Sequence, residues 1–257
     1  AYTMTEAVKD GITVNLVYDG RAAKVMLNQD KVRQIEEYYA QCELEGANEH
    51  QVEESQKAVA KMEVIIGDPD RLRAVAEDFI KHYETRVAEG ATVAGKAMFV
   101  CSNRNIAYDF YKIVKELRPE WTEKKICDDG VVLSEKDKKE LKPMEKIKLV
   151  MTRNKDDEKD LFDMLGTKED RKEFDRQFKN PKSNFKIAIV VDMWLTGFDV
   201  PELDTIYIDK PIQQHTLIQT ISRVNRVCEG KDKGLIVDYI GIKKNMNTAL
   251  KKYTNFE

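Results

Sequence analysis

The stretch KIAIVVDMWLTGFDVPELDTIYID, residues 186–209, contains two short apolar runs joined by a polar loop. Residues 186–191 and 204–209 are typical of buried strands. Further runs of this kind lie at 97–101, 147–151 and 234–239, and residues 12–21 alternate apolar and polar side chains as a half-buried strand does. Segments with apolar residues at helical spacing separate most of these runs. Alternating strands and helices predict an α/β fold, with a parallel sheet covered by helices on both faces.

The composition limits the possible functions. The chain has 257 residues, 42% of them hydrophobic, with 43 Lys+Arg against 46 Asp+Glu and a formal net charge of −3. This balance lacks the global basic signature of nucleic-acid binding, so any DNA contact needs a local patch. The sequence has no apolar run of about 20 residues that could span a membrane, and its start lacks the features of a signal peptide. We therefore expect a cytoplasmic protein without membrane contact. The start without an initiator methionine suggests a piece of a longer protein.

The cysteines and histidines do not have the spacing of a metal site. Cys42, Cys101, Cys127 and Cys228 are scattered without a CxxC pair, and the chain has three histidines. We expect buried thiols, with neither zinc nor disulfides.

The segment GATVAGKA, residues 90–97, nearly matches a phosphate-binding loop but does not fit that role. Ala97 stands where a hydroxyl must hold Mg²⁺. A phosphate loop also needs a strand before it and a helix after it, whereas here a helix precedes and a strand follows. We interpret 90–97 as a linker into the sheet. If the chain contacts a nucleotide, another region must bind most of it.

Two loops that follow predicted strands carry polar side chains suited to ligand contact. Parallel sheets bind ligands at the carboxyl ends of their strands. After 186–191, Thr196 is suited to contact a phosphate, Gly197 to allow close backbone approach, and Asp199 to orient an arginine or a ribose hydroxyl. The alternative is a tight loop in which Thr196 and Asp199 satisfy local backbone groups. After 97–101, Ser102 and Asn103 are first of all helix-cap candidates.

The stretch QTISRVNR, residues 219–226, predicts a cationic helix face. At about 100° per residue, Gln219, Arg223 and Arg226 fall within roughly 60° of one another. Apolar residues gather on the opposite side. Two arginines a turn apart make an anion clamp, because each guanidinium presents a planar fork of donors. An ordinary solvated helix face is the alternative.

In combination these motifs resemble the second RecA-like domain of superfamily-2 helicases and translocases. VCSNRN at 100–105 resembles the fourth motif of that family, LTGFDVP at 195–201 the fifth, and QTISRVNR the sixth, with Ser222 in place of the usual glycine. That departure, together with DKPIQQHTLIQTISRVNR and AVKDGITVNLVYDGR, makes the chain similar to the motor portion of the restriction subunit of type I restriction–modification enzymes. The resemblance is weakest in 28–70 and 120–146.

The resemblance implies an ATP-driven double-stranded DNA translocase joined to a nuclease, working with methyltransferase and specificity subunits. Arg223 and Arg226 would face the γ-phosphate, with Gln219 beside them. Gly197 and Asp199 would belong to the ATP cleft, and Thr196 would couple DNA contact to it. Ser102, Asn103 and Arg104 are candidate DNA contacts. ATP and Mg²⁺ would be bound mainly by an upstream motor domain, so this piece alone should hydrolyse little ATP.

The expected organisation has four parts. Residues 1–30 would end the preceding motor domain, 31–93 form a helical connector, and 241–257 begin a following helical region. Residues 94–240 would form the second RecA-like domain, with a charged insertion at 120–146 that is either solvated surface or DNA-facing. No residue set points to a nuclease site or to a protein-bound metal. Two other interpretations stay open: a non-enzymatic RecA-like module that binds DNA or partner subunits, and a self-sufficient nucleotide-binding enzyme, which would need a phosphate loop.

Overall fold

A six-stranded parallel sheet forms the centre of the computed structural model, in the order β1-β6-β5-β2-β4-β3. The structure describes residues 4–25, 33–34, 37, 60–212, 214–243 and 246–247. The strands are β1 Asn15–Gly20, β2 Ala97–Cys101, β3 Ile147–Val150, β4 Ile187–Val190, β5 Thr205–Asp209 and β6 Lys233–Asp238. All five neighbouring pairs are parallel. The predicted α/β fold with a parallel sheet is therefore confirmed.

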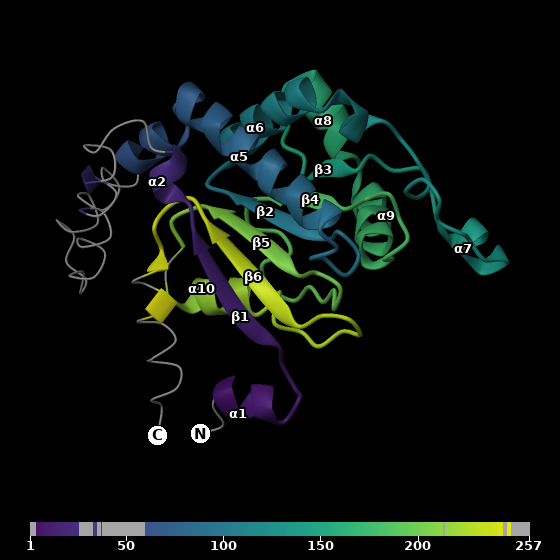
Figure 1. Cartoon of the computed structure of the whole chain (residues 1–257). Coiled ribbons are helices and arrows are strands. Elements are labelled where there is room, and N and C mark those ends of the chain that lie inside the picture. The colour runs from purple at the N-terminus through teal and green to yellow at the C-terminus, as the bar shows by residue number, and fades with distance from the viewer. Residues whose placement is uncertain are drawn as a thin grey trace.

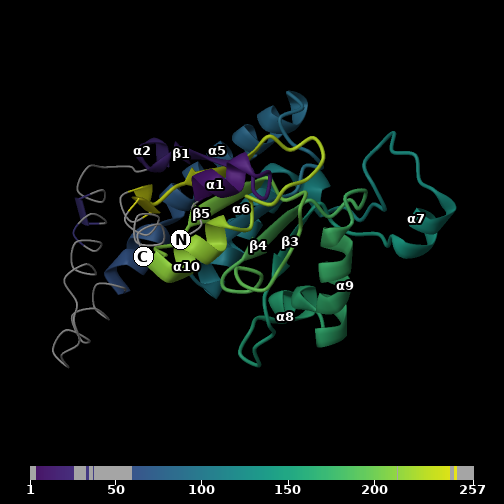
Figure 2. The ribbon, with the colours of Figure 1, turned by 90° about the horizontal axis from the view of Figure 1, so that it is seen from below.

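Helices cover both faces of this sheet. The helices described are α1 Met4–Lys9, α2 Ala22–Val25, α5 Pro69–Ala88, α6 Arg104–Leu117, α7 Glu135–Glu140, α8 Lys159–Leu165, α9 Lys168–Lys179 and α10 Gln214–Ile221, with a 3₁₀ turn at Pro119–Thr122. Figure 2 shows α5 and α6 along one side of the sheet, and α8, α9 and α10 along the other. Asp68 caps α5, and a capping box formed by Thr167 and Asp170 opens α9.

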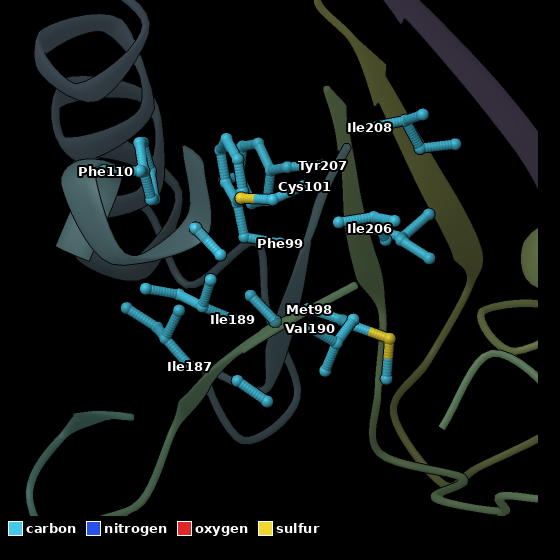
Figure 3. Close-up of a cluster of buried hydrophobic side chains, with 14 of the residues drawn as sticks. Met98, Phe99, Cys101, Phe110, Ile187, Ile189, Val190, Ile206, Tyr207 and Ile208 are labelled. Carbon is cyan, nitrogen blue, oxygen red and sulfur yellow. The ribbon is translucent and has the colours of Figure 1, made fainter. Parts of the chain in front are cut away.

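The core fills the space between the sheet and these helices. Strands β2, β4 and β5 are buried throughout, as expected for central parallel strands. Phe99 stacks on Phe110 of α6 with ring centroids 4.0 Å apart, and Phe79 of α5 meets Phe99 and Tyr207 edge-on. Figure 3 shows the side chains of these strands gathered in one cluster.

The described parts of the two N-terminal segments pack onto this sheet. Residues 1–30 were expected to end a preceding domain, but β1 pairs along its whole length with β6. The 31–93 segment was expected to be a connector, yet α5 buries Leu72, Val75 and Phe79 against the core. Both elements therefore belong structurally to the sheet that carries the site. The division of the chain into domains stays a prediction.

The middle of the charged insertion at 120–146 stands away from the sheet, while Trp121 and Met144 near its two ends are buried in the core. Figures 1 and 2 both show α7 at the end of a long excursion from the body. Its contacts with the rest of the chain include ion pairs of Lys182 with Asp137 and of Lys142 with Glu173. Helix α7 has no buried residue, which fits both a solvated and a DNA-facing surface.

A polar network lies between α5 and the sheet. Arg21 donates to both carboxylate oxygens of Asp78, and His82 Nδ1 lies 2.9 Å from the Tyr207 hydroxyl. Burial and the nearby Arg21 charge lower the pKa of His82 from 6.5 to about 4. His82 is therefore held as neutral imidazole in the folded protein.

This shift predicts an acid sensitivity that depends on His82. Because its folded pKa is below the unfolded value, the unfolded chain binds more protons between about pH 6.5 and pH 4, so stability falls as the pH drops through that window. In His82→Asn, which keeps a polar group near the Tyr207 hydroxyl, the urea midpoint should fall less steeply over this range. The two proteins should differ least in pH slope above pH 7. Equal losses of stability on acidification would contradict the assignment.

Candidate functional site

The predicted site residues lie at two opposite edges of the sheet. Ser102, Asn103 and Arg104 follow β2 at the carboxyl edge. Helix α10 begins after β5 at that edge and returns toward the start of β6, so the arginines lie near the amino edge. The carboxyl ends were expected to carry the loop residues, and the arginines lie at the other edge. A helix joining two parallel strands must run back along the sheet, which carries its last residues to the other edge.

The predicted helix through Arg226 is also wrong, because α10 ends at Ile221. The amide of Ser222 still bonds four residues back, but the amides of Arg223 and Val224 bond three residues back, which tightens the final turn. Asn225 O then accepts from Val14 N at 2.9 Å, and Arg226 forms an antiparallel bridge with Thr13. Backbone groups inside a helix are bonded along the helix axis and cannot also pair with a neighbouring extended segment. The pairing with the segment before β1 therefore ends α10.

The apolar side of the stretch is mostly as predicted. Leu217, Ile221 and Val224 are fully buried, while Cys228 is only partly buried. Cys101 is buried and Cys127 is partly buried, and Cys42 lies outside the described residues. The expectation of buried thiols therefore holds for Cys101 alone among the described cysteines.

The guanidinium of Arg223 is tied to the loop that follows β4. Its Nη1 donates to Phe198 O at 2.5 Å, and its Nε donates to Gln219 O at 3.0 Å. Nη2 has only a long 3.4 Å contact with Ser222 Oγ. Partial burial, followed by the nearby charge of Arg226, lowers the pKa of Arg223. The Arg223 side chain is therefore fixed in place, but its Nη2 group remains a hydrogen-bond donor that makes only one weak contact.

Arg226 extends toward solvent beside the same loop. Its Nε lies 3.4 Å from Asp199 Oδ1, with the two side chains 51% and 60% exposed. An exposed pair at this distance contributes little to stability, so it orients Arg226 without neutralising it. Asp199 thus meets an arginine, the first of the two roles that the sequence left open. Gly197 has φ +67, a left-handed backbone that glycine adopts readily, and both Thr196 and Gly197 are exposed.

Gln219 contributes through its backbone. Its carbonyl oxygen accepts from Arg223 Nε and from Ser222 Oγ, and its side chain is half-buried. Ser222, which replaces the glycine of the common motif, thus helps to close the end of α10.

The carboxyl-edge candidates all have structural partners. Ser102 Oγ donates to Asp209 O at 3.0 Å, and the Asn103 side chain accepts from Ile106 N as the cap of α6. Arg104 donates to Thr152 O and to both oxygens of Asp157. Asn103 is therefore confirmed as a helix cap, and Arg104 clamps the loop after β3.

One lysine that the sequence analysis did not single out joins the arginine site. Lys231 Nζ donates to Pro201 O at 2.9 Å and to Leu203 O at 2.8 Å, which fastens the turn before β6 to the loop after β4. Burial lowers its pKa to about 8, partly offset by Asp204. The sequence GKDKG does not show that Lys231 is buried, because nothing in the spacing distinguishes Lys231 from the exposed Lys233.

The segment 90–96 lies between α5 and β2, the helix-then-strand order that argued against a phosphate loop. Lys96, at the position of the phosphate-loop lysine, is 1% exposed and donates to Phe185 O. It is committed to the protein interior.

Comparison with known proteins places the chain in a family. The model described as "Type I restriction enzyme subunit R domain 3" matches residues 93–241, more than half of the chain. The chain is 36% identical over 257 residues to the type I restriction enzyme HindI endonuclease subunit of Haemophilus influenzae, and equally identical to a protein from Methanocaldococcus jannaschii assigned as the MjaIXP endonuclease subunit. The alignments cover 99% of this chain and 22% of each relative. The chain therefore belongs to the R subunits of type I restriction enzymes.

A solved structure agrees with the fold. A fragment assigned to the HsdR subunit of a type I restriction enzyme from Vibrio vulnificus superposes with a TM-score of 0.52 at 12% identity, covering 93% of this chain and 34% of that one. The predicted RecA-like class is consistent with this likeness. In the described part of the chain, no helix is long and apolar enough to cross a membrane.

The close approach of β6 to the arginine segment makes Gly234 critical. A Cβ at Gly234 would lie 2.2 Å from Val224 O and 2.7 Å from its carbonyl carbon, both backbone atoms that cannot rotate away. Gly234→Ala should lower the free energy of unfolding by about 1–3 kcal/mol, the range for overpacking. Chemical denaturation measures this, with Lys233→Ala at the neighbouring exposed position as the control. Equal stability of the two variants would contradict the predicted clash.

Proposed function

We propose that this chain is the second motor lobe of an ATP-dependent double-stranded DNA translocase, within the restriction subunit of a type I restriction enzyme. The supporting observation is the placement of Arg223 and Arg226 by one loop at one edge of the sheet. The chain spans about a fifth of the length of its relatives, at 22%. The other wall of the ATP cleft, with its phosphate loop and Mg²⁺-binding acid, would lie in the parent outside this chain.

The charges around the two arginines fit a polyphosphate. Partial burial and then the nearby charge of Arg226 lower the pKa of Arg223, so the two guanidinium groups lie close enough to interact. Asp199 is the acid paired with Arg226, and both are largely exposed. Two guanidinium groups facing one weakly paired carboxylate leave positive charge that phosphate oxygens can neutralise.

Bound ATP and Mg²⁺ would supply the phosphoryl group and the metal that neutralises its developing charge. Arg223 and Arg226 would contact the terminal phosphate, while Asp199 keeps Arg226 oriented. Gly197 would let the loop approach the cleft, and Gln219 would support Arg223 through its carbonyl. A finger arginine contributes roughly 10³–10⁵ in rate in phosphoryl transfer.

The DNA contact that we propose at Thr196 follows from its exposure. Thr196 is exposed on the loop after β4, the loop that also holds Arg223. A DNA phosphate bound at Thr196 would therefore lie close to the arginine site. Ser102, Asn103 and Arg104 stay candidates for the DNA surface, with Arg104 acting through the loop it clamps. Uncharged and backbone donors of this kind position DNA without reading its sequence.

The rest of the function belongs to the parent. Methyltransferase and specificity subunits are the proposed partners, and the nuclease site is proposed to lie outside this chain. Cytoplasmic location is part of the same proposal. A non-enzymatic docking module is the rival function, and it would not need two arginines held at one edge.

Substituting the arginines in the full-length parent tests the proposal. Arg223→Ala and Arg226→Ala should each reduce DNA-stimulated ATP hydrolysis by about 10³-fold, because each removes charge that stabilises the transferring phosphoryl group. Binding of double-stranded DNA should be retained. Arg176→Ala, at an exposed arginine on α9, is the control and should hydrolyse ATP normally.

Near-normal hydrolysis by both arginine variants would exclude the motor role for this site. If these variants also kept normal binding of the partner subunits, the docking-module function, which does not need the two arginines, would be favoured instead.

A further inference from the structure

Trp194 has an unusual backbone conformation in the loop after β4. Its φ is +68, and it is the one non-glycine residue with positive φ in the part of the chain that the structure describes. A bulky side chain rarely adopts this left-handed region because its Cβ crowds the backbone. Such strain persists only where surrounding contacts hold it, and it concentrates at functional sites.

A flat ring stack holds this conformation. The rings of Trp194 and Phe198 are parallel within 2° and their centroids lie 4.2 Å apart. Phe178 of α9 packs on both rings, at 5.3 Å from Trp194 and 6.0 Å from Phe198, and Lys179 Nζ lies 5.1 Å from the centre of the Phe198 ring. The stack therefore fastens residues 194–198 to α9.

The stack connects the exposed tip of the loop to Arg223. Thr196 and Gly197 lie between the two rings in sequence and are exposed, while Leu195 is buried. At the far end of the turn, Phe198 O accepts the 2.5 Å hydrogen bond from Arg223. The stacked ring and the carbonyl belong to the same residue, so the stack limits how this carbonyl can move, while Gln219 O holds the Arg223 Nε independently.

We propose that Trp194 is a positioning residue, whose stack on Phe198 transmits contact at the Thr196–Gly197 tip to Arg223. The inference rests on the proposed motor function and adds the element that links its DNA and ATP surfaces. A phosphate bound at the tip changes the backbone of 196–197. Because the stacked rings limit how that change is absorbed, it reaches Phe198 O. A ligand shifts a site only through contacts that differ between its two arrangements, and the Phe198–Arg223 bond supplies that difference.

Three variants of the full-length parent test the inference, with linear double-stranded DNA and ATP as probes. Trp194→Gly removes the stack but suits the positive φ, so the backbone conformation is retained without strain. Its DNA-stimulated kcat should fall by about tenfold to hundredfold, the range for misplaced catalytic groups. The KM for ATP and the low DNA-free rate should change little. Trp194→Phe keeps a stacking ring and should rescue most of the kcat. Arg223→Ala should be inactive under both conditions.

The outcomes separate this inference from the motor function. Normal stimulation in Trp194→Gly, together with an inactive Arg223→Ala, would overturn the inference and leave the motor function standing. An active Arg223→Ala would overturn both. Equal losses with and without DNA, or failure of Trp194→Phe to restore kcat, would also overturn the transmission role, because a purely structural defect is not selective for DNA stimulation. Selective loss in Trp194→Gly with rescue by Trp194→Phe supports it.

Discussion

The ion pair of Arg71 with Asp209 is the constraint on which the arrangement of loops depends. Both side chains are fully buried, and Arg71 also donates to Ile66 O and Tyr239 O. The carbonyl oxygen of Asp209 accepts in turn from Ser102 Oγ. One guanidinium thus joins the start of α5 to the ends of β5 and β6, and through Ser102 to the end of β2. Breaking a buried pair on one side leaves an unpaired charge, at a cost of roughly 3–5 kcal/mol.

From that fixed edge, two connections carry the site across the molecule. Helix α10 leaves the end of β5 and brings Arg223 to the opposite edge. The loop after β4 makes the same crossing, from the carboxyl end of β4 to the start of β5. On this loop, Phe198 O accepts a hydrogen bond from Arg223, and Asp199 pairs with Arg226. Lys231 donates a hydrogen bond to the last part of the loop. The surface proposed for DNA and the surface proposed for ATP are therefore joined by one short, tightly held segment.

The sequence predicted the helices and strands better than the contacts between segments that are far apart in the chain. Apolar runs, together with the alternating residues 12–21, located the six described strands, because these patterns depend on residues that are close in the sequence. The end of α10 could not be predicted, since it depends on backbone pairing of Asn225 and Arg226 with residues near Thr13, about 210 positions away. For the same reason, the roles of Arg104 and Lys231 required the fold: nothing adjacent in the sequence shows that Asp157 or the Pro201 carbonyl lies opposite them.

The most direct test of the central claim is the distance from the Arg223 and Arg226 guanidinium nitrogens to the terminal phosphate of a non-hydrolysable ATP analogue. It would be measured in a structure of the full-length parent bound to double-stranded DNA. We predict hydrogen-bonding distances of about 2.7–3.2 Å for at least one nitrogen of each arginine. A structure in which the analogue is bound while both guanidinium groups face solvent, DNA or another subunit would contradict the account.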